Sequence, residues 1–222
     1  RASLLPLVLE HVSFVVNGRT IIDNVSCTIE AGLRTVILGP NGAGKSVLLR
    51  LCHGLLAPTS GRIEWRGSAG AQPRRSQAMV FQRPVMLRRS AIANVTYALA
   101  LAGVPRRLRL GRAQAALRAV GLSQVAKHPA RVLSGGEQQR LALARAWAIE
   151  PDVFFLDEPT ANLDPGATRE VEDIVERVRA AGSKVVMATH NLGQTPRLAD
   201  QVESGKLFRR CEDFLWSVRC NM

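Results

Sequence analysis

An eight-residue glycine-rich segment carries the clearest chemistry in the chain. Residues Gly39 to Ser46 read GPNGAGKS and match the pattern GxxxxGK[ST] in full. The apolar run Thr35 to Leu38 precedes them, and apolar residues recur at helical spacing from Val47 to Leu55. Strand, glycine loop and helix therefore follow in the order of a phosphate-binding P-loop. We expect Lys45 to reach the β- and γ-phosphate oxygens and Ser46 to bind Mg²⁺.

A glycine-rich turn without a ligand is the alternative interpretation of this segment, and the flanking strand and helix patterns disfavour it. The backbone N–H groups of such a loop, with the helix N-terminus, hold phosphate oxygens. The predicted ATP contacts here are Gly39, Pro40, Asn41, Gly42, Ala43, Gly44, Lys45 and Ser46.

Two adjacent carboxylates end a second buried-strand pattern. The run Val153 to Leu156 is apolar and is followed directly by Asp157 and Glu158. Asp157 suits the hold on Mg²⁺ that a P-loop ATPase needs, and Glu158 is placed to accept a proton from the attacking water or to polarise it. The alternative is a charged turn before Pro159, which is less favoured beside a complete P-loop.

The octapeptide Leu133 to Arg140 reads LSGGEQQR and opens a third pattern. Ser134 and Glu137 have the spacing of a capping box at a helix start, which is the simplest interpretation. A plain cap does not need Gly135 and Gly136, however, and glycines at a helix N-terminus let backbone N–H groups approach a phosphate oxygen. Both interpretations stay open at this point.

Length and composition set the class of protein. The chain has 222 residues, of which 46% are hydrophobic, and this suits one α/β domain with an inserted lobe. No run of about twenty apolar residues predicts a membrane span, and Arg1 to Glu10 lacks the pattern of a signal peptide. The four cysteines form no CxxC pair, so we expect reduced thiols.

The charge balance is strongly basic. The net charge is +12, and only four of the 30 basic residues are lysines. A basic surface suits nucleic acid or an anionic membrane face. The densest cluster, Arg106 to Arg112, has no interleaved aromatic residues to stack on bases, so we expect no nucleic-acid partner.

These motifs, in this order, resemble the ATP-binding cassette (ABC) ATPases from about Leu9 to Val202. The resemblance implies an α/β fold: a P-loop NTPase (RecA-like) core with an antiparallel β edge subdomain and an inserted α-helical signature subdomain. It implies ATP and Mg²⁺ as cofactors. The predicted single domain, 1–222, divides into a core of 1–82 and 131–205, a helical insert of 83–130 and an atypical tail of 206–222.

The resemblance also implies roles for single residues. Gln82, after the strand-like Met79 to Phe81, resembles the Q-loop glutamine that touches Mg²⁺ and the attacking water. His190 resembles the switch histidine that contacts the γ-phosphate. Asn162 to Asp164 resembles the D-loop at the dimer interface, and we include Asp164 among the ATP contacts. The signature residues Ser134, Gly135 and Gly136 are implied to close over ATP held by a second copy.

One position departs from the family pattern. The family stacks an aromatic residue on adenine after the first strand, and aligning Leu9 to Gly18 puts Val16 there. We therefore include Val16 among the predicted ATP contacts. Phe14, two residues earlier and on the same face of a strand, is the alternative stacking residue.

The region between Gln82 and Ser134 has a helical sequence pattern rather than a strand pattern. Ala91 to Gly103 and Leu108 to Val120 show helical spacing. The resemblance implies that this insert receives the coupling helix of a membrane subunit. The implied partners are a second ATPase subunit, expected as a homodimer, transmembrane permease subunits and a substrate-binding protein, with the ATPase peripheral at the cytoplasmic face of the cell membrane.

The predicted function is the ATP-binding and ATP-hydrolysing subunit of a membrane ABC transporter. The stretch Met79 to Leu99 resembles importers of oxyanions, tungstate in particular, with phosphate and molybdate relatives. The alternatives are a small ABC exporter and an ABC ATPase acting on DNA or ribosomes. The short Gln82 to Ser134 interval and the single P-loop disfavour the latter. After Asp200 to Val202 the family's last apolar strand is shortened.

Overall fold

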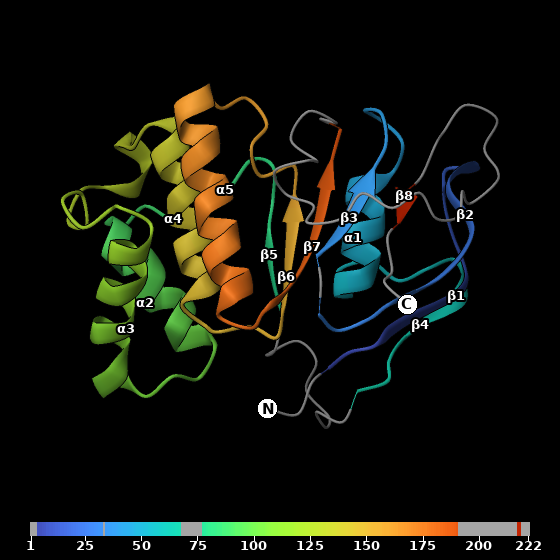
Figure 1. The fold of residues 1–222 in the computed structure, drawn as a ribbon, viewed down its shortest axis with the longest axis horizontal. Helices are drawn as coiled ribbons and strands as arrows, with labels where there is room; N and C mark the ends of the chain where they lie inside the picture. Colours follow the sequence, from blue (N-terminus) through green and yellow to red (C-terminus); the bar gives the residue numbers. More distant parts are fainter. Residues whose placement is uncertain (1–3, 33, 68–76, 191–216, 219–222) are drawn as a thin grey trace.

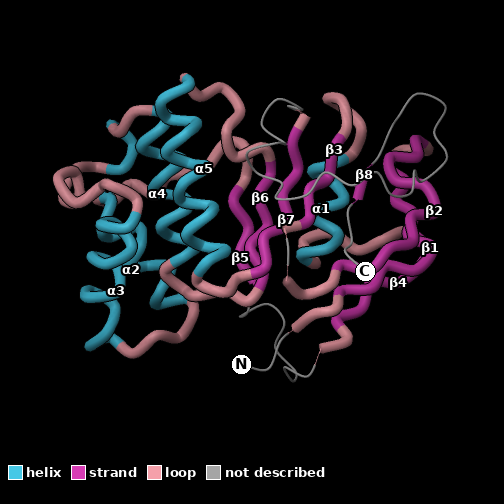
Figure 2. Tube along the Cα trace, viewed as in Figure 1, coloured by secondary structure: helices cyan, strands magenta, loops and turns pink. Residues whose placement is uncertain are grey.

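The computed structural model describes residues 4–32, 34–67, 77–190 and 217–218. A mainly parallel sheet stands in the middle of the molecule, with helices on one side and a smaller antiparallel sheet on the other (Figures 1 and 2). None of the helices within these ranges is long and apolar enough to span a membrane. The strand expected after Asp200 lies outside the described residues, as does nearly all of the tail.

The central sheet has the strand order β5-β6-β7-β3-β8. Its first four strands pair in parallel, and β8 pairs antiparallel with β3. Their bounds are β5 (Gln77–Val80), β6 (Val153–Asp157), β7 (Lys184–Thr189), β3 (Thr35–Leu38) and β8 (Ser217–Val218). The carboxyl ends of the parallel strands meet at one edge, where the phosphate-binding loop and both predicted carboxylates emerge.

Strand β6 shows why its sequence is apolar throughout. All five of its residues are buried, because the sheet is covered on both faces. Phe154 and Leu156 pack into the core on the helical side, whereas Val153 and Phe155 pack into the core beneath the antiparallel sheet. This alternation follows from the two-residue period of a strand.

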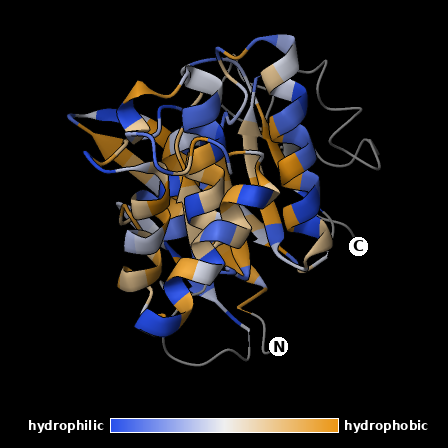
Figure 3. Ribbon diagram, turned by 90° about the vertical axis from the view of Figure 1, so that its left-hand side faces the viewer, coloured by the Kyte–Doolittle hydropathy of each residue, from blue (hydrophilic) through white to orange (hydrophobic). Residues whose placement is uncertain are grey.

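Four helices form the layer on one side of the sheet. α4 (Gly135–Trp147) and α5 (Pro165–Ala180) contact each other and the sheet, and α2 (Ala91–Leu101) and α3 (Arg106–Ala119) pack against α4. A short 3₁₀ turn, η2 (Ala130–Val132), leads into α4. Figure 3 looks onto this layer and shows hydrophilic and hydrophobic residues interleaved along the helices. The two helices predicted between Gln82 and Ser134 are confirmed, with slightly different ends.

The antiparallel sheet has the order β2-β1-β4. Its strands are β1 (Leu7–Val16), β2 (Arg19–Ile29) and β4 (Ser60–Trp65), and α1 (Lys45–His53) packs between it and the central sheet. Asn17 and Gly18 join β1 to β2 with φ of 50° and 75°. Positive φ at both central residues is the geometry of a tight type I′ hairpin, which fixes the strand register near the tip.

Helix α1 ends earlier than its apolar pattern predicts. Gly54 adopts a φ of 79°, and the N–H groups of Gly54 and Leu55 donate to the carbonyls of Leu51 and Arg50. This left-handed glycine cap closes the helix. Leu55, expected on the buried helical face, therefore lies beyond the helix and is 52% exposed.

The predicted fold class is confirmed. An α/β arrangement with a parallel sheet, an antiparallel edge sheet and a helical layer is present, as the P-loop ATPase core requires. The division into core 1–82 and 131–205, insert 83–130 and tail 206–222 stays a prediction, although α2 and α3 both lie within the predicted insert.

Candidate active site

The loop between β3 and α1 borders a large hollow. Gly42 and Gly44 have φ of 83° and 80°, a conformation that glycine adopts without strain. The hollow has a volume of about 1150 Å³, and we call it the P-loop cavity. Its lining comes from the β1–β2 hairpin, the phosphate-binding loop, Gln82, the segment after β6, the start of α5 and the end of β7.

Lys45 is held at the floor of this cavity. Its side chain is only 4% exposed, and its Nζ donates to the carbonyl oxygens of Gly39 and Pro40, each at 2.9 Å. The same Nζ lies 3.2 Å from Glu158 Oε1. Gly39 and Pro40, both predicted to contact ATP, are not among the residues lining the cavity. Their carbonyl oxygens contact Lys45 instead.

Ser46 and Asp157 meet although 111 positions separate them in sequence. Ser46 Oγ donates to Asp157 Oδ1 at 2.7 Å, and Asp157 is 3% exposed. Burial raises the pKa of the Asp157 carboxyl, and the hydrogen bond from Ser46 opposes that shift. A hydroxyl and a carboxylate side by side are the hard oxygen donors that Mg²⁺ prefers.

Mg²⁺ keeps several water and phosphate ligands, so two protein ligands suffice. No group of three or more His, Cys, Asp or Glu residues in the described ranges is placed to hold a metal. The residues present therefore fit a cation that shares its coordination with nucleotide phosphates.

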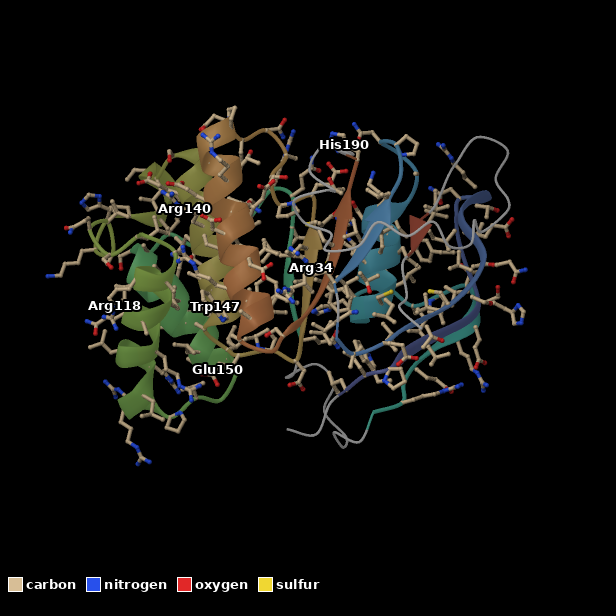
Figure 4. The ribbon with its side chains drawn as sticks, viewed as in Figure 1. Arg34, Arg118, Arg140, Trp147, Glu150 and His190 are labelled. Atoms are coloured by element: carbon tan, nitrogen blue, oxygen red, sulfur yellow. The ribbon has the colours of Figure 1, made fainter. Side chains whose placement is uncertain are left out.

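Glu158 turns out of the end of β6 with a left-handed φ of 46°. This conformation is uncommon for a residue with a side chain. Its N–H donates to the carbonyl of Ala188 at 2.9 Å, which fixes the turn against β7. Its carboxylate contacts both Lys45 and His190, with His190 Nδ1 2.8 Å from Oε2. His190 itself lies just past the end of β7 (Figure 4). The structure thus brings together the three residues predicted from separate motifs.

Gln82 also lines the P-loop cavity, just after β5. The two residues predicted to stack on adenine do not line this cavity. Val16 is exposed and is not among the lining residues, and Phe14 packs against the core beneath the antiparallel sheet. Arg19, the cross-strand partner of Val16, lines the cavity instead. The sequence pattern did not single out Arg19.

The signature segment borders a second hollow of about 480 Å³, the signature hollow. Ser134 caps α4: its Oγ accepts from Glu137 N at 3.3 Å, and its N–H donates to Glu137 Oε2 at 2.8 Å. These hydrogen bonds lower the pKa of the Glu137 carboxyl. The predicted capping box is confirmed, and Gly135 and Gly136 line the same hollow.

The two hollows adjoin through the segment after β6. Asn162 and Leu163 line both, whereas Asp164 lines only the signature hollow. Asp164 caps α5 by accepting from the N–H groups of Gly166 and Ala167, and these bonds lower the pKa of its carboxyl. Its predicted ATP contact is therefore not to the cavity of its own phosphate-binding loop. The predicted roles of the individual site residues remain proposals.

A glycine loop at a helix N-terminus, a buried lysine and a serine–aspartate pair beside a further carboxylate define a nucleotide-phosphate hydrolase of the P-loop class. A family model described as "ABC transporter" matches residues 22–161, more than half of the chain. The chain belongs to the ABC transporter family and is an ATPase.

Several proteins are similar over most of this chain. The tungstate uptake system ATP-binding protein TupC of Peptoclostridium acidaminophilum is 39% identical over 194 residues, covering 86% of this chain and 91% of the relative. The phosphate import ATP-binding protein PstB 2 of Natronomonas pharaonis is 38% identical, with 88% and 75% covered. The methionine import ATP-binding protein MetN of Corynebacterium glutamicum is 38% identical, with 85% and 56% covered.

Solved structures agree with this membership. The structure of cbiO1 from Clostridium perfringens, described as part of the ABC transporter complex cbiONQ, has a TM-score of 0.76 and 29% identity, covering 90% of this chain and 83% of that one. The ATP binding subunit of another ABC transporter has a TM-score of 0.75 and 23% identity, with 88% and 84% covered, and shares the fold.

Proposed function

We propose that this ATPase energises an importer of an oxyanion, tungstate in particular, as one of two copies that share their nucleotide sites. One observation supports the proposal that two chains share each nucleotide site. The signature residues line a hollow separate from the P-loop cavity of their own chain. A chain with this geometry supplies the phosphate cradle of one site and the signature of another.

Within one site the roles follow from the contacts. Asn41 to Ser46 present backbone N–H groups to the phosphates, and Lys45 exchanges its contact with Glu158 for the β- and γ-phosphate oxygens. Ser46, Asp157 and Gln82 would hold Mg²⁺, which neutralises charge on the phosphate oxygens when bound. These residues come from three separate segments that meet at one edge of the sheet.

Release from Lys45 frees Glu158 to orient the attacking water and accept its proton. His190, 2.8 Å from Glu158 in this state, is placed to hold that carboxylate or to donate to the γ-phosphate. The remaining contacts come from the partner chain. Ser134 with Gly135 and Gly136 would close over the γ-phosphate, where the α4 N-terminus favours negative charge.

ATP closes the pair and hydrolysis opens it, a two-state change biased by the γ-phosphate. The partners that use this motion are permease subunits, at whose cytoplasmic face the ATPase binds, together with a substrate-binding protein. The helical layer containing α2 and α3 is the part that we assign to the permease contact.

Two features support an oxyanion. The Met79 to Leu99 stretch resembles oxyanion importers, and a tungstate-system ATPase and a phosphate-system ATPase are both similar over most of the chain. Methionine-system ATPases are similar to a comparable degree. The ATPase does not contact the cargo, so its sequence supports the substrate class only by likeness.

Uptake by cells separates the three cargoes. Deletion of the gene should abolish high-affinity tungstate uptake while phosphate and methionine uptake continue, and re-expression of the wild-type chain, but not of Lys45→Ala, should restore it. Selective loss of phosphate or methionine uptake would reassign the cargo. Loss of efflux would indicate an exporter, and ATPase activity stimulated by DNA or ribosomes would overturn transport.

A further inference from the structure

The P-loop cavity extends in two directions from the phosphate-binding loop. One end is formed by residues 160–163 and the start of α5, which directly follow Glu158 in sequence. The other end is formed by the β1–β2 hairpin, on the opposite side of α1 in Figure 1. Glu158 and His190 are proposed to act at the γ-phosphate. The nucleoside is at the opposite end of the phosphate chain, so we expect it to lie toward the hairpin.

The hairpin is positioned against the loop by close packing. A Cβ added to Gly44 would lie 3.0 Å from the Ile21 carbonyl oxygen and 3.0 Å from Ile22 Cδ1. Ile21 therefore borders the first turn of α1. Arg19 is two residues earlier on the same strand, so its side chain shares the face of Ile21. Both residues line the cavity.

The guanidinium of Arg19 is available to a ligand. Arg19 is exposed, and its side chain has neither a hydrogen bond nor an ion pair with any residue in the described ranges. The tight hairpin turn at Asn17 and Gly18 fixes its register opposite Val16. The backbone of Arg19 is thus fixed beside the cavity, and its side chain has no hydrogen bond or ion pair within the described part of the chain.

The other surfaces at this end are apolar. Ile21 and Val47 line the cavity together with Arg19, and no Phe, Tyr or Trp is among the described lining residues. A flat aromatic ligand can lie on such aliphatic surface with one face left to cover. A guanidinium is planar, weakly hydrated and able to stack on aromatic faces, which an ammonium cannot do as well.

We propose that Arg19 stacks its guanidinium on the nucleobase of the bound nucleotide, the position for which neither Val16 nor Phe14 is placed. This inference rests on the P-loop site of the proposed function. Stacking on a base face contacts the nucleoside alone, whereas an ion pair with phosphate would act on the other half of the ligand. Two ligands that differ only in the nucleoside therefore separate the two contacts.

The test is calorimetric titration of the purified chain with ADP and with inorganic pyrophosphate, both with Mg²⁺. Neither ligand is hydrolysed by the γ-phosphate chemistry. Arg19→Ala should weaken ADP binding about threefold to tenfold and leave pyrophosphate binding unchanged. Arg19→Trp restores planarity without charge and should recover ADP binding, whereas Arg19→Lys restores charge without planarity and should not.

Arg107→Ala is the matched control, because it removes the same charge from an exposed site on α3. It should change neither affinity. Equal weakening of ADP and pyrophosphate by Arg19→Ala, or recovery by Lys but not Trp, would replace stacking by a phosphate contact. If Arg19→Ala and the wild-type chain bind ADP equally well, the stacking proposal is overturned, but the P-loop remains the nucleotide site. A wild-type chain that binds neither ligand would overturn both.

Discussion

The P-loop cavity and the signature hollow differ in how their groups are held. Lys45 and Glu158 line the cavity and Asp157 directly precedes Glu158; all three are buried and contact partners far away in sequence. In the signature hollow, the side-chain hydrogen bonds of Ser134 within the described ranges all go to Glu137 at the start of the same helix. The first is a charged site assembled by the tertiary fold, and the second is bordered by a helix N-terminus whose cap is formed within four residues. The proposal that a second chain completes the signature hollow accounts for this difference.

The cavity also contains its own substitute for the ligand. The Glu158 carboxylate contacts the Lys45 ammonium, which we propose binds the γ-phosphate when ATP is present. A buried ammonium and a buried carboxylate each need an opposite charge, since an unpaired buried charge is strongly destabilising. The signature hollow has no comparable buried ion pair to exchange among its described residues: Arg140 pairs with Glu170, whose side chain is exposed.

Among the changes considered, loss of Lys45 from the P-loop cavity should have the largest effect on ATP hydrolysis. Lys45→Ala removes the cation that contacts the phosphates, so hydrolysis should fall about a thousandfold, and the chain should remain monomeric with ATP. Phosphate release and size-exclusion chromatography with ATP measure both effects. Lys127→Ala, which removes an exposed lysine from the insert, should retain activity and pairing. ATP-dependent pairing of Lys45→Ala would contradict the assignment.

Neutralising Glu158 should separate binding from chemistry. Glu158→Gln removes the base, so kcat should fall about 10²- to 10³-fold. ATP binding should tighten, because Lys45 no longer has to leave a carboxylate, and an ATP-bound pair should accumulate. Single-turnover kinetics and chromatography check these results against Glu30→Gln, an exposed control. Hydrolysis by Glu158→Gln at the wild-type rate would exclude Glu158 as the base.

Changes in the signature hollow should have a smaller effect on the isolated chain. Ser134→Ala should leave ADP binding by the monomer unchanged and lower hydrolysis about tenfold to a hundredfold through loss of a phosphate contact. Loss of the cap should also lower stability by about 1 kcal/mol. Ser90→Ala loses the equivalent cap of α2 and should lose stability without losing hydrolysis. Equal loss of hydrolysis in both variants would reduce Ser134 to a structural cap.

The smallest expected effect concerns Glu137 and pH. Its folded pKa is lowered from 4.5 by hydrogen bonds at the α4 start. Its contribution to stability is therefore present above the unfolded value and is lost as pH falls through the folded value. Urea unfolding at pH 7 should show Glu137→Ala destabilised by about 0.5 kcal/mol, since solvent screens an exposed site. The difference should shrink at pH 3, and a constant difference would exclude the carboxylate.

The motifs predicted the local elements well, because short-range patterns determine them. The strand Thr35–Leu38 and the capping box at Ser134 occur where the sequence placed them. Ser46 and Asp157 were each predicted to bind Mg²⁺, and they meet because both lie at the edge where the carboxyl ends of the parallel strands come together. Local pattern could not place the Arg19 side chain, since that depends on how the hairpin packs against Gly44.

The sequence motifs also could not predict that the P-loop cavity and the signature hollow are separate. It depends on how α4 and the segment after β6 pack in three dimensions, and Asp164 was assigned to ATP without knowledge of which hollow it faces. Leu55 shows the same limit on a smaller scale: helical spacing continues past Gly54, but the left-handed cap ends the helix first.

A mixing experiment tests the composite site most directly. Lys45→Ala lacks a working phosphate cradle and Ser134→Arg lacks a working signature, so each alone should be nearly inactive. A mixed pair regains one complete site, formed by the cradle of one chain and the signature of the other. An equimolar mixture should therefore recover ATPase activity well above the sum of its separate components, since only mixed pairs contain a complete site; a quarter of the wild-type activity is the value for random pairing, with one of two sites complete in about half of the pairs. A mixture no more active than the sum of its separate components would contradict the shared site.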